Sequence, residues 1–259
     1  MKSCITLSLV PSLRGGPWVL WDDLPEGFRK ASEFGFDSVE LFTDGPNAGH
    51  PGQLKSLLSE FDLSLGAVGT GAGKVLHGLT LTSSEKSIRK KAKAFISEMI
   101  QFGAEFGAPA IIGSMQGNWS LENPRMDAID QLSEALIELG EEANKNDTFL
   151  IYEPLNRYET NLFNRCTDAA DFLRNENISG VRLLADLFHM NIEEENISES
   201  IRYCFDFLGH VHFADSNRRP IGNGHLDIQP IAKTLIELGY KGFISAEAFD
   251  WPTPDQAAI

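Results

Sequence analysis

Four side chains that are able to bind a divalent cation follow one another through the second half of the chain. They are Glu153, Asp186, His212 and Glu247, and each stands within or at the end of a short apolar segment. The intervals between them are 33, 26 and 35 residues. A charge at the end of a buried strand is costly unless something compensates it. Recurrence at similar intervals therefore predicts that the four side chains meet at one place.

Two glutamates, an aspartate and a histidine form an oxygen-rich ligand set. Such a set suits Mn²⁺ or Mg²⁺, and the imidazole also allows Co²⁺ or Zn²⁺. Three neighbouring carboxylates would repel one another, and a divalent cation removes that cost. Any one of these residues alone would equally suit a hydrogen-bonded polar residue of the core. The four together indicate a shared site for one divalent metal ion.

The elements that would position these residues are short apolar segments that alternate with longer amphipathic ones. The alternation predicts a parallel sheet. Eight units in 259 residues correspond to about 32 residues each, the usual size in a (β/α)8 barrel. The alternative is a doubly wound open sheet, but no GxGxxG motif follows the first segment. We therefore predict an α/β fold, a (β/α)8 TIM barrel, with one domain over residues 1–259. Its strands are expected at residues 4–10, 37–42, 63–69, 108–115, 148–153, 181–187, 210–215 and 242–249.

In such a barrel the functional side chains lie at the carboxyl ends of the strands. Four successive strands would each bring one ligand to the same rim. The seventh segment carries two histidines, and we expect its alternation to turn only one of them toward the barrel interior. His212 is chosen over His210, because Val211 and Phe213 then point into the helix layer.

Composition limits the function further. The formal net charge of −15 argues against a sequence-independent grip on nucleic acid and against binding to anionic membranes. Three dispersed cysteines suggest reduced thiols and a cytoplasmic setting. No apolar stretch approaches the roughly 18 residues of a membrane span. The apolar run near the N-terminus is interpreted as a first strand rather than as a signal peptide.

Four stretches of the sequence resemble the xylose isomerase-like TIM barrels. They are "EPLNRYETNLFN" (153–164), "ADLFHMNIEE" (185–194), "HVHFADSNRRPIGNGHLD" (210–227) and "AEAF" (246–249). Within that superfamily they are most similar to the ketose 3-epimerases, the group of D-tagatose, D-psicose (allulose) and L-ribulose 3-epimerases. The resemblance is strong over residues 148–249 and looser before them.

The resemblance implies a role for each matching residue. The metal ligands would be Glu153, Asp186, His212 and Glu247, and the substrate-binding residues would be Glu159, His189 and Arg218. Glu153 and Glu247 would also be the catalytic acid/base pair. Epimerisation of a ketose at C3 needs bases on opposite faces of a cis-enediolate, with a cation on the O2 and O3 oxygens.

Other residues are weaker candidates. Glu40 lies at the end of the second predicted strand, His225 lies in the "GNGH" stretch, and Trp119 would either stack on a sugar ring or cover the barrel. The loops that set substrate choice in the resembling group match no assignable pattern here. Lys74 and His77 in one of them are compatible with a phosphorylated or acidic sugar.

Three other functions stay open at this point. An aldose–ketose or hydroxypyruvate-type isomerase would use the same metal and carboxylates. A non-catalytic sugar-binding barrel would keep the pocket without proton transfer. An endonuclease-type barrel would need more histidine ligands than the six in this chain and a basic face, and the net charge counts against it. The expected partner is a small-molecule sugar, with no nucleic acid and no membrane, and a homo-oligomer is compatible with the sequence.

Overall fold

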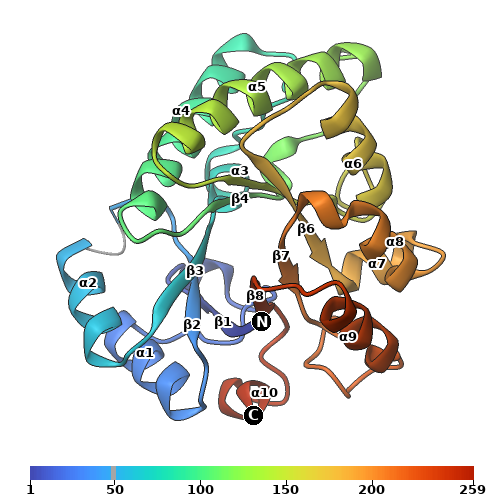
Figure 1. Ribbon diagram of the computed structural model, residues 1–259. Helices are drawn as coiled ribbons and strands as arrows, with labels where there is room; N and C mark the ends of the chain where they lie inside the picture. The colour runs from blue at the N-terminus through green and yellow to red at the C-terminus, as the bar shows by residue number, and fades with distance from the viewer. Residues whose placement is uncertain (48–50) are drawn as a thin grey trace.

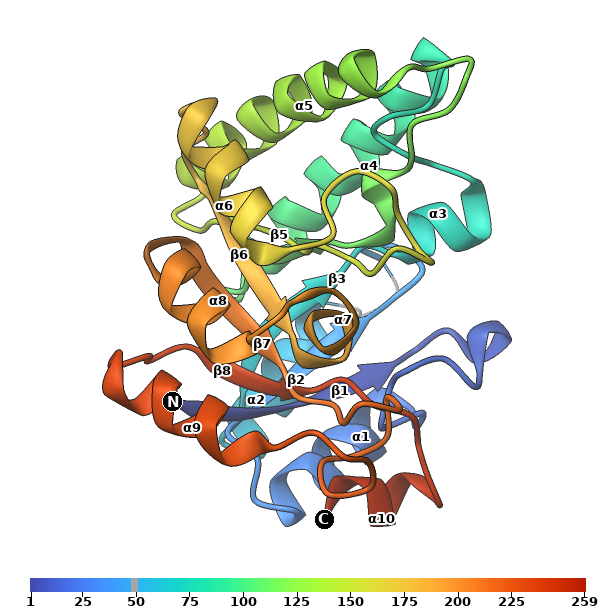
Figure 2. The ribbon, with the colours of Figure 1, turned by 90° about the vertical axis from the view of Figure 1, so that its right-hand side faces the viewer.

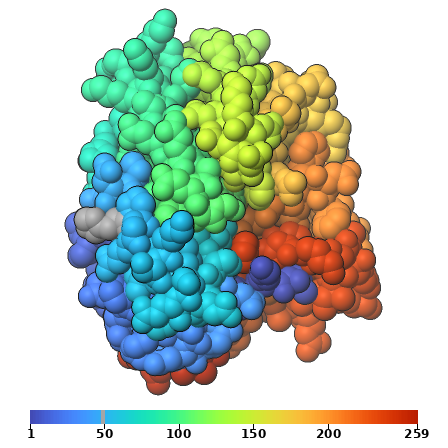
Figure 3. All heavy atoms as spheres, turned by 60° about the vertical axis from the view of Figure 1, so that its left-hand side comes forward, coloured from blue at the N-terminus to red at the C-terminus, as the bar shows by residue number. Residues whose placement is uncertain are grey.

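The chain forms a closed ring of eight parallel strands (Figure 1). The structure is a computed structural model that describes residues 1–47 and 51–259. The strands are β1 (Lys2–Ser8), β2 (Ser38–Phe42), β3 (Ser64–Gly69), β4 (Ala110–Ile112), β5 (Leu150–Tyr152), β6 (Val181–Asp186), β7 (Leu208–His212) and β8 (Phe243–Ala246). Each strand pairs in parallel with the next, and β1 pairs with β8. The dark-blue N-terminal residues accordingly lie between the cyan and red segments in Figure 3. The predicted (β/α)8 barrel is confirmed, and the open-sheet alternative is wrong because the first and last strands pair.

The helices surround this ring. They are α1 (Leu24–Glu33), α2 (Pro51–Glu60), α3 (Ala72–His77), α4 (Lys86–Ala104), α5 (Arg125–Lys145), α6 (Cys166–Asn175), α7 (Leu187–Glu193), α8 (Ile197–Cys204), α9 (Ile228–Glu237) and α10 (Pro254–Ala258). The two longest, α4 and α5, lie side by side (Figures 1 and 2), and the Ser97 hydroxyl donates to Glu142 across them at 2.6 Å. Each outer helix turns an apolar stripe toward the sheet, as its spacing of apolar residues predicts.

The strands are buried on both faces, which explains why they read as continuous apolar runs rather than as alternating ones. Leu150 and Tyr152 pack in the layer between sheet and helices. Ile151 between them joins a separate cluster with Ala67, Ile111 and Leu184. The strand register brings Glu40 beside Ala67 and His210 beside Leu184, so these two polar residues lie at the level of that cluster.

Most predicted strand limits agree with the structure to within a few residues. The fourth predicted strand is too long, because Ser114–Gln116 form a 3₁₀ turn after β4. The seventh begins earlier than predicted, at Leu208, and ends at His212. Three glycines that follow helices have φ angles of 69–82°, the left-handed conformation that suits a residue without a Cβ. They are Gly35, Gly107 and Gly239.

Two other expectations concern the whole chain. All three cysteines are buried and unpaired, as expected for reduced thiols. Within residues 1–47 and 51–259, no helix combines the length and the apolar character needed to cross a bilayer.

Candidate active site

The four predicted metal ligands lie together at the carboxyl ends of β5 to β8. Each offers one ligand atom, and these atoms all lie within 4.8 Å of one another. The Nδ1 atom of His212 is 3.4 Å from Oε2 of Glu247, 3.5 Å from Oδ2 of Asp186 and 3.8 Å from Oε1 of Glu153. The predicted convergence is therefore present, and the role of these atoms as metal ligands stays a prediction.

Three of these ligand atoms are buried without a hydrogen-bond partner among the described residues. They are Oε1 of Glu153, Oδ2 of Asp186 and Nδ1 of His212. A buried polar atom left unpaired costs about 1–3 kcal/mol. The other oxygen of Asp186 caps α7, where it accepts from the backbone N–H groups of Phe188 (2.7 Å) and His189 (3.1 Å). The donor set and its unpaired atoms therefore fit a divalent cation.

The backbone around Glu153 is held from β4 and from the turn that follows it. The Gln116 side chain donates to the Glu153 carbonyl at 3.0 Å and accepts from the Tyr152 hydroxyl at 2.6 Å. A Cβ on Gly113 would lie 2.4 Å from Oε2 of Glu153. Glycine at position 113 thus leaves the room that the Glu153 carboxylate occupies.

Burial and crowding shift the proton affinities of the metal-free site. Burial, and then the neighbouring Glu247, raise the pKa of Glu153. Burial would also raise the pKa of Asp186, but His189 and His212 outweigh it and the net direction is down. Burial would lower the pKa of His212, whereas Glu40 and Glu247 raise it well above its usual range. Protons therefore balance part of the negative charge when no cation is bound.

The three predicted substrate-binding residues border the same site. Arg218 donates to Oε2 of Glu247 at 2.9 Å, and its Nη1 lies 3.4 Å from Oε1 of Glu159. His189 accepts at Nδ1 from the backbone N–H of Asn156 at 3.2 Å. Its Nε2 has no partner among the described residues and lies 3.9 Å from Oε1 of Glu153. Burial lowers the pKa of His189, which favours a neutral ring with its N–H directed into the site.

A cavity of about 200 Å³ opens next to the ligands. It is polar on the side of the ligands, where Glu153, His212 and Glu247 line it. Its other walls include the rings of Trp18 and Phe42, whose centroids are 4.0 Å apart. The remaining lining residues are Pro17, Glu40, Gly69, Thr70, Gly71, Val75, Ile111, Gly113, Ser114, Leu155, Glu159 and Arg218.

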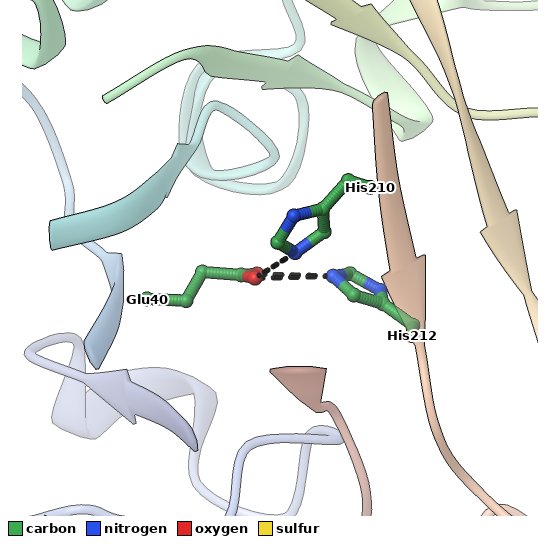
Figure 4. A group of neighbouring side chains, drawn as sticks. All are labelled: Glu40, His210 and His212. Carbon is green, nitrogen blue, oxygen red and sulfur yellow. Dashed lines mark hydrogen bonds and ion pairs between the residues drawn. The ribbon is translucent and has the colours of Figure 1, made fainter. Parts of the chain in front are cut away.

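The prediction that only one of the two β7 histidines faces the interior is wrong. Both rings point inward, and both contact Glu40 on β2 (Figure 4). The physical reason is the period of a strand, because residues two positions apart share a face and the residue between them, Val211, points to the helices. His210 and Glu40 therefore belong to the surroundings of the site.

The remaining candidates lie outside the cavity. His225 is exposed and contacts the Ser216 hydroxyl at 3.1 Å. The indole of Trp119 donates to the Asn161 carbonyl at 3.0 Å and does not line the cavity. Lys74 and His77 lie on α3, whose Val75 does line it. Sequence reasoning missed Trp18, Phe42 and Asn156, because only the fold brings these residues close to the predicted ligands.

A family model for xylose isomerase-like TIM barrels matches residues 28–259. The chain belongs to this family. Among the curated relatives of this chain, a D-psicose 3-epimerase from Ruminiclostridium cellulolyticum is 29% identical, over 85% of this chain and 76% of its own length. An L-ribulose 3-epimerase from Mesorhizobium japonicum is 26% identical, over 90% of this chain and 78% of its own length. A 3-dehydro-D-guloside 4-epimerase from Escherichia coli is 27% identical, over 87% of each chain. All three are epimerases, which supports an enzyme of the isomerase/epimerase class.

Solved structures agree with the barrel fold. A 3-keto-D-glucoside 4-epimerase from E. coli superposes with a TM-score of 0.82 at 22% identity, over 100% of this chain and 96% of that one. A D-psicose 3-epimerase from Clostridium cellulolyticum H10, solved with D-tagatose, gives 0.82 at 24% identity with the same coverage. At these identities the likeness shows the fold alone.

Proposed function

We propose that this barrel is a divalent-metal-dependent epimerase that inverts C3 of a ketose. The observation that carries the proposal is the meeting of three buried polar atoms, on Glu153, Asp186 and His212, that have no hydrogen-bond partner in residues 1–47 and 51–259 and lie beside the carboxylate of Glu247. The 3-epimerases among the relatives support the same reaction. Mn²⁺ or Mg²⁺ suits the three carboxylates best, with Co²⁺ or Zn²⁺ as alternatives.

Glu153 and Glu247 are the proposed proton-transfer groups. Inversion at a carbon next to a carbonyl requires one group to remove a proton and another to return it on the opposite face. The two glutamates directly follow different strands, β5 and β8, and both line the cavity, so each has its own approach to a substrate between them. A divalent cation bound by the four ligands would stabilise the negative charge that develops on the substrate oxygens.

The neighbouring side chains would orient substrate and catalytic groups. The Nε2–H of His189 has no other partner among the described residues, and we propose that it donates to a substrate oxygen. Arg218 holds Glu247 through a charge-assisted hydrogen bond of 2.9 Å. We propose that Glu159, next to Arg218, accepts from a sugar hydroxyl. Trp18 and Phe42 offer an apolar aromatic wall to the carbon–hydrogen face of the sugar.

A second candidate reaction is epimerisation at C4 of a 3-keto sugar. The E. coli 3-dehydro-D-guloside 4-epimerase favours it, because its match covers 87% of both chains. The chemistry again inverts a carbon next to a carbonyl, so the same pair of glutamates would serve it.

Conversion of a sugar panel tests the proposal. Free ketoses, aldoses and 3-keto glycosides are incubated with the purified protein plus Mn²⁺ and, in parallel, with chelator-treated protein. A C3-epimeric ketose formed only with metal supports the proposal. A C4 epimer supports the second candidate, and an aldose from a ketose supports an aldose–ketose isomerase. Failure to convert any of these sugars would argue for a non-catalytic barrel.

A further inference from the structure

A buried carboxylate on β2 lies directly behind the candidate metal site. Glu40 extends across the barrel interior toward β7, and its Oε1 and Oε2 are both 3.2 Å from Nε2 of His212 (Figure 4). Oε2 also contacts Nε2 of His210 at 2.9 Å. All three side chains are almost completely buried. Glu40 thus joins two rings that stand at 82° to each other on the same strand.

The two ring nitrogens of His212 face different partners. Nε2 faces Glu40, whereas Nδ1 faces the three carboxylates of the candidate metal site. An ionised carboxylate only accepts hydrogen bonds, so Glu40 requires an N–H on the Nε2 atom. In a neutral imidazole the other nitrogen then carries the lone pair. Glu40 therefore selects the tautomer of His212 whose Nδ1 is able to bind a metal ion.

The surroundings leave Glu40 little freedom. His210 occupies one of its oxygens from β7, and the register keeps Glu40 beside Ala67 of the interior apolar cluster. The two histidine rings contact the carboxylate group, and the pairing of β2 fixes the backbone from which the side chain extends.

We propose that Glu40 is a positioning residue for the metal centre, which holds His212 in the orientation and tautomer that present Nδ1 to the cation. His210 contributes indirectly, because its contact with Glu40 helps to fix the position of that carboxylate. This inference rests on the proposed metal site and adds to it a residue that is not one of the four predicted ligands. Hydrogen-bond partners behind a histidine ligand generally change metal affinity by about 10- to 100-fold when they are removed.

Glu40, His210 and His212 also have the composition of a second metal site, and their ligand atoms lie within 4.8 Å of one another. The contacts argue against that use. Nε2 of each histidine already pairs with Glu40, and none of these atoms is among the unpaired buried atoms of the described residues. The unpaired atom of the group is Nδ1 of His212, which faces the other site.

The test is Mn²⁺ titration of the whole protein, followed by calorimetry, for the wild type and three variants. Glu40→Gln keeps the shape but places an amide N–H against one of the rings. Glu40→Asp keeps the carboxylate on a shorter arm. Glu194→Gln is the matched control. The Glu194 carboxylate is partly buried and lies outside the site, where it accepts hydrogen bonds from the backbone N–H of Cys166 and the hydroxyl of Ser200. Nitrogen-15 NMR of the Zn²⁺-loaded protein reports the His212 tautomer independently of activity.

The expected result is one Mn²⁺ per chain in the wild type, with affinity lowered about 10- to 100-fold in Glu40→Gln and less in Glu40→Asp. Glu194→Gln should bind as the wild type does, and the Nε2–H signal of His212 should be lost or shifted only in Glu40→Gln. Unchanged affinity in both Glu40 variants would overturn the inference, and so would a second bound ion that Glu40→Gln removes. If Glu40→Gln does not fold, the affinity of Glu40→Asp decides. A wild-type protein that binds no divalent cation would instead reject the proposed function.

Discussion

Oδ2 of Asp186 lies 3.5 Å from Nδ1 of His212, while the other oxygen of the same carboxylate caps α7. One side chain therefore contributes both to the fold and to the candidate site. The capping bonds fix its orientation, and α7 carries His189, whose Nε2 lies 4.0 Å from Oδ2 of Asp186. This division of the two oxygens allows the structural and the chemical role to be separated by mutation.

Asp186→Asn should abolish tight metal binding and leave the fold intact. Asparagine caps a helix about as well as aspartate, so we expect the free energy of unfolding of the metal-free protein to change by less than about 1 kcal/mol. The charge and the free oxygen toward His212 are lost, and Mn²⁺ affinity should fall at least about 100-fold. Calorimetric titration and thermal unfolding measure the two effects.

The control for this variant is the neighbouring cap of α8. Asn196 accepts from the Glu199 N–H at 3.2 Å and lies outside the site. Asn196→Ala should cost about 1 kcal/mol of stability and leave metal affinity unchanged. Tight Mn²⁺ binding by Asp186→Asn would remove Asp186 from the ligand set.

Glu247→Gln and Glu153→Gln should each lower turnover about 100- to 10,000-fold, the usual contribution of a positioned acid or base. The amide has nearly the same shape, so circular dichroism should show an unchanged fold. Initial rates with a converted sugar measure the effect. Wild-type turnover in either variant would exclude that glutamate from the proton-transfer pair.

Gly113→Ala should disturb the site through Glu153. The added Cβ would lie 2.4 Å from Oε2 of Glu153, so the carboxylate must move. Overpacking of this kind costs about 1–3 kcal/mol, and we expect weaker metal binding with it. Gly52→Ala is the control: its Cβ meets nothing within 4 Å among the described residues, and near the start of α2 alanine is a better helix former than glycine, so this variant should not be destabilised. Equal metal affinity in both variants would show that Glu153 tolerates displacement.

Metal affinity should rise with pH. The raised pKa values of Glu153 and His212 mean that the metal-free site holds protons that a bound cation must displace. Mn²⁺ dissociation constants between pH 5 and pH 8, together with proton release in two buffers of different ionisation enthalpy, measure this. Binding without proton release would contradict the assigned ligands.

The stability of the metal-free protein should depend on pH through the same two groups, Glu153 and His212. Because the folded-state pKa of Glu153 is raised, its contribution to stability is fully present below the unfolded value of about 4.3 and is lost as pH rises toward the folded pKa. For His212, also raised, the contribution is present below about 6.5 and is lost as pH rises through its folded pKa. Denaturant unfolding of chelator-treated protein at several pH values measures both. A cation added in excess should remove the loss.

Trp18→Ala should raise KM with little change in kcat, because the ring lines the cavity but carries no group that would transfer a proton in the proposed reaction. Trp119→Ala should leave both constants unchanged, since its indole contacts Asn161 outside the cavity. Steady-state kinetics of the two variants decide between the two tryptophans. A larger effect from Trp119 would place the substrate elsewhere.

The barrel and the convergence of four ligands followed from the sequence because both depend on a repeat. Alternating apolar and amphipathic segments specify parallel strands, and one polar residue per unit then reaches a common rim. Glu153 and Asp186 could be placed in this way without knowledge of any contact. The side chains that surround them could not, because Glu40 meets His212 across the barrel from a strand 172 residues away in sequence.

The error at His210 has a different origin. The sequence itself places both histidines on one face, since residues two positions apart on a strand point to the same side. The Trp18–Phe42 wall depends instead on loop conformation after β1 and on the end of β2. No periodic pattern specifies such a contact.

Exchange of solvent deuterium into the sugar is the most direct test of the proposed epimerisation at C3. A ketose that the enzyme converts is incubated in D2O with Mn²⁺-loaded protein, with chelator-treated protein and with Glu247→Gln. Carbon-13 NMR then locates the deuterium. We expect deuterium at C3 of the epimerised product with the loaded wild type, and no deuterated product in the other two samples. Deuterium confined to C1 or C2, or epimerisation without any exchange, would contradict this expectation.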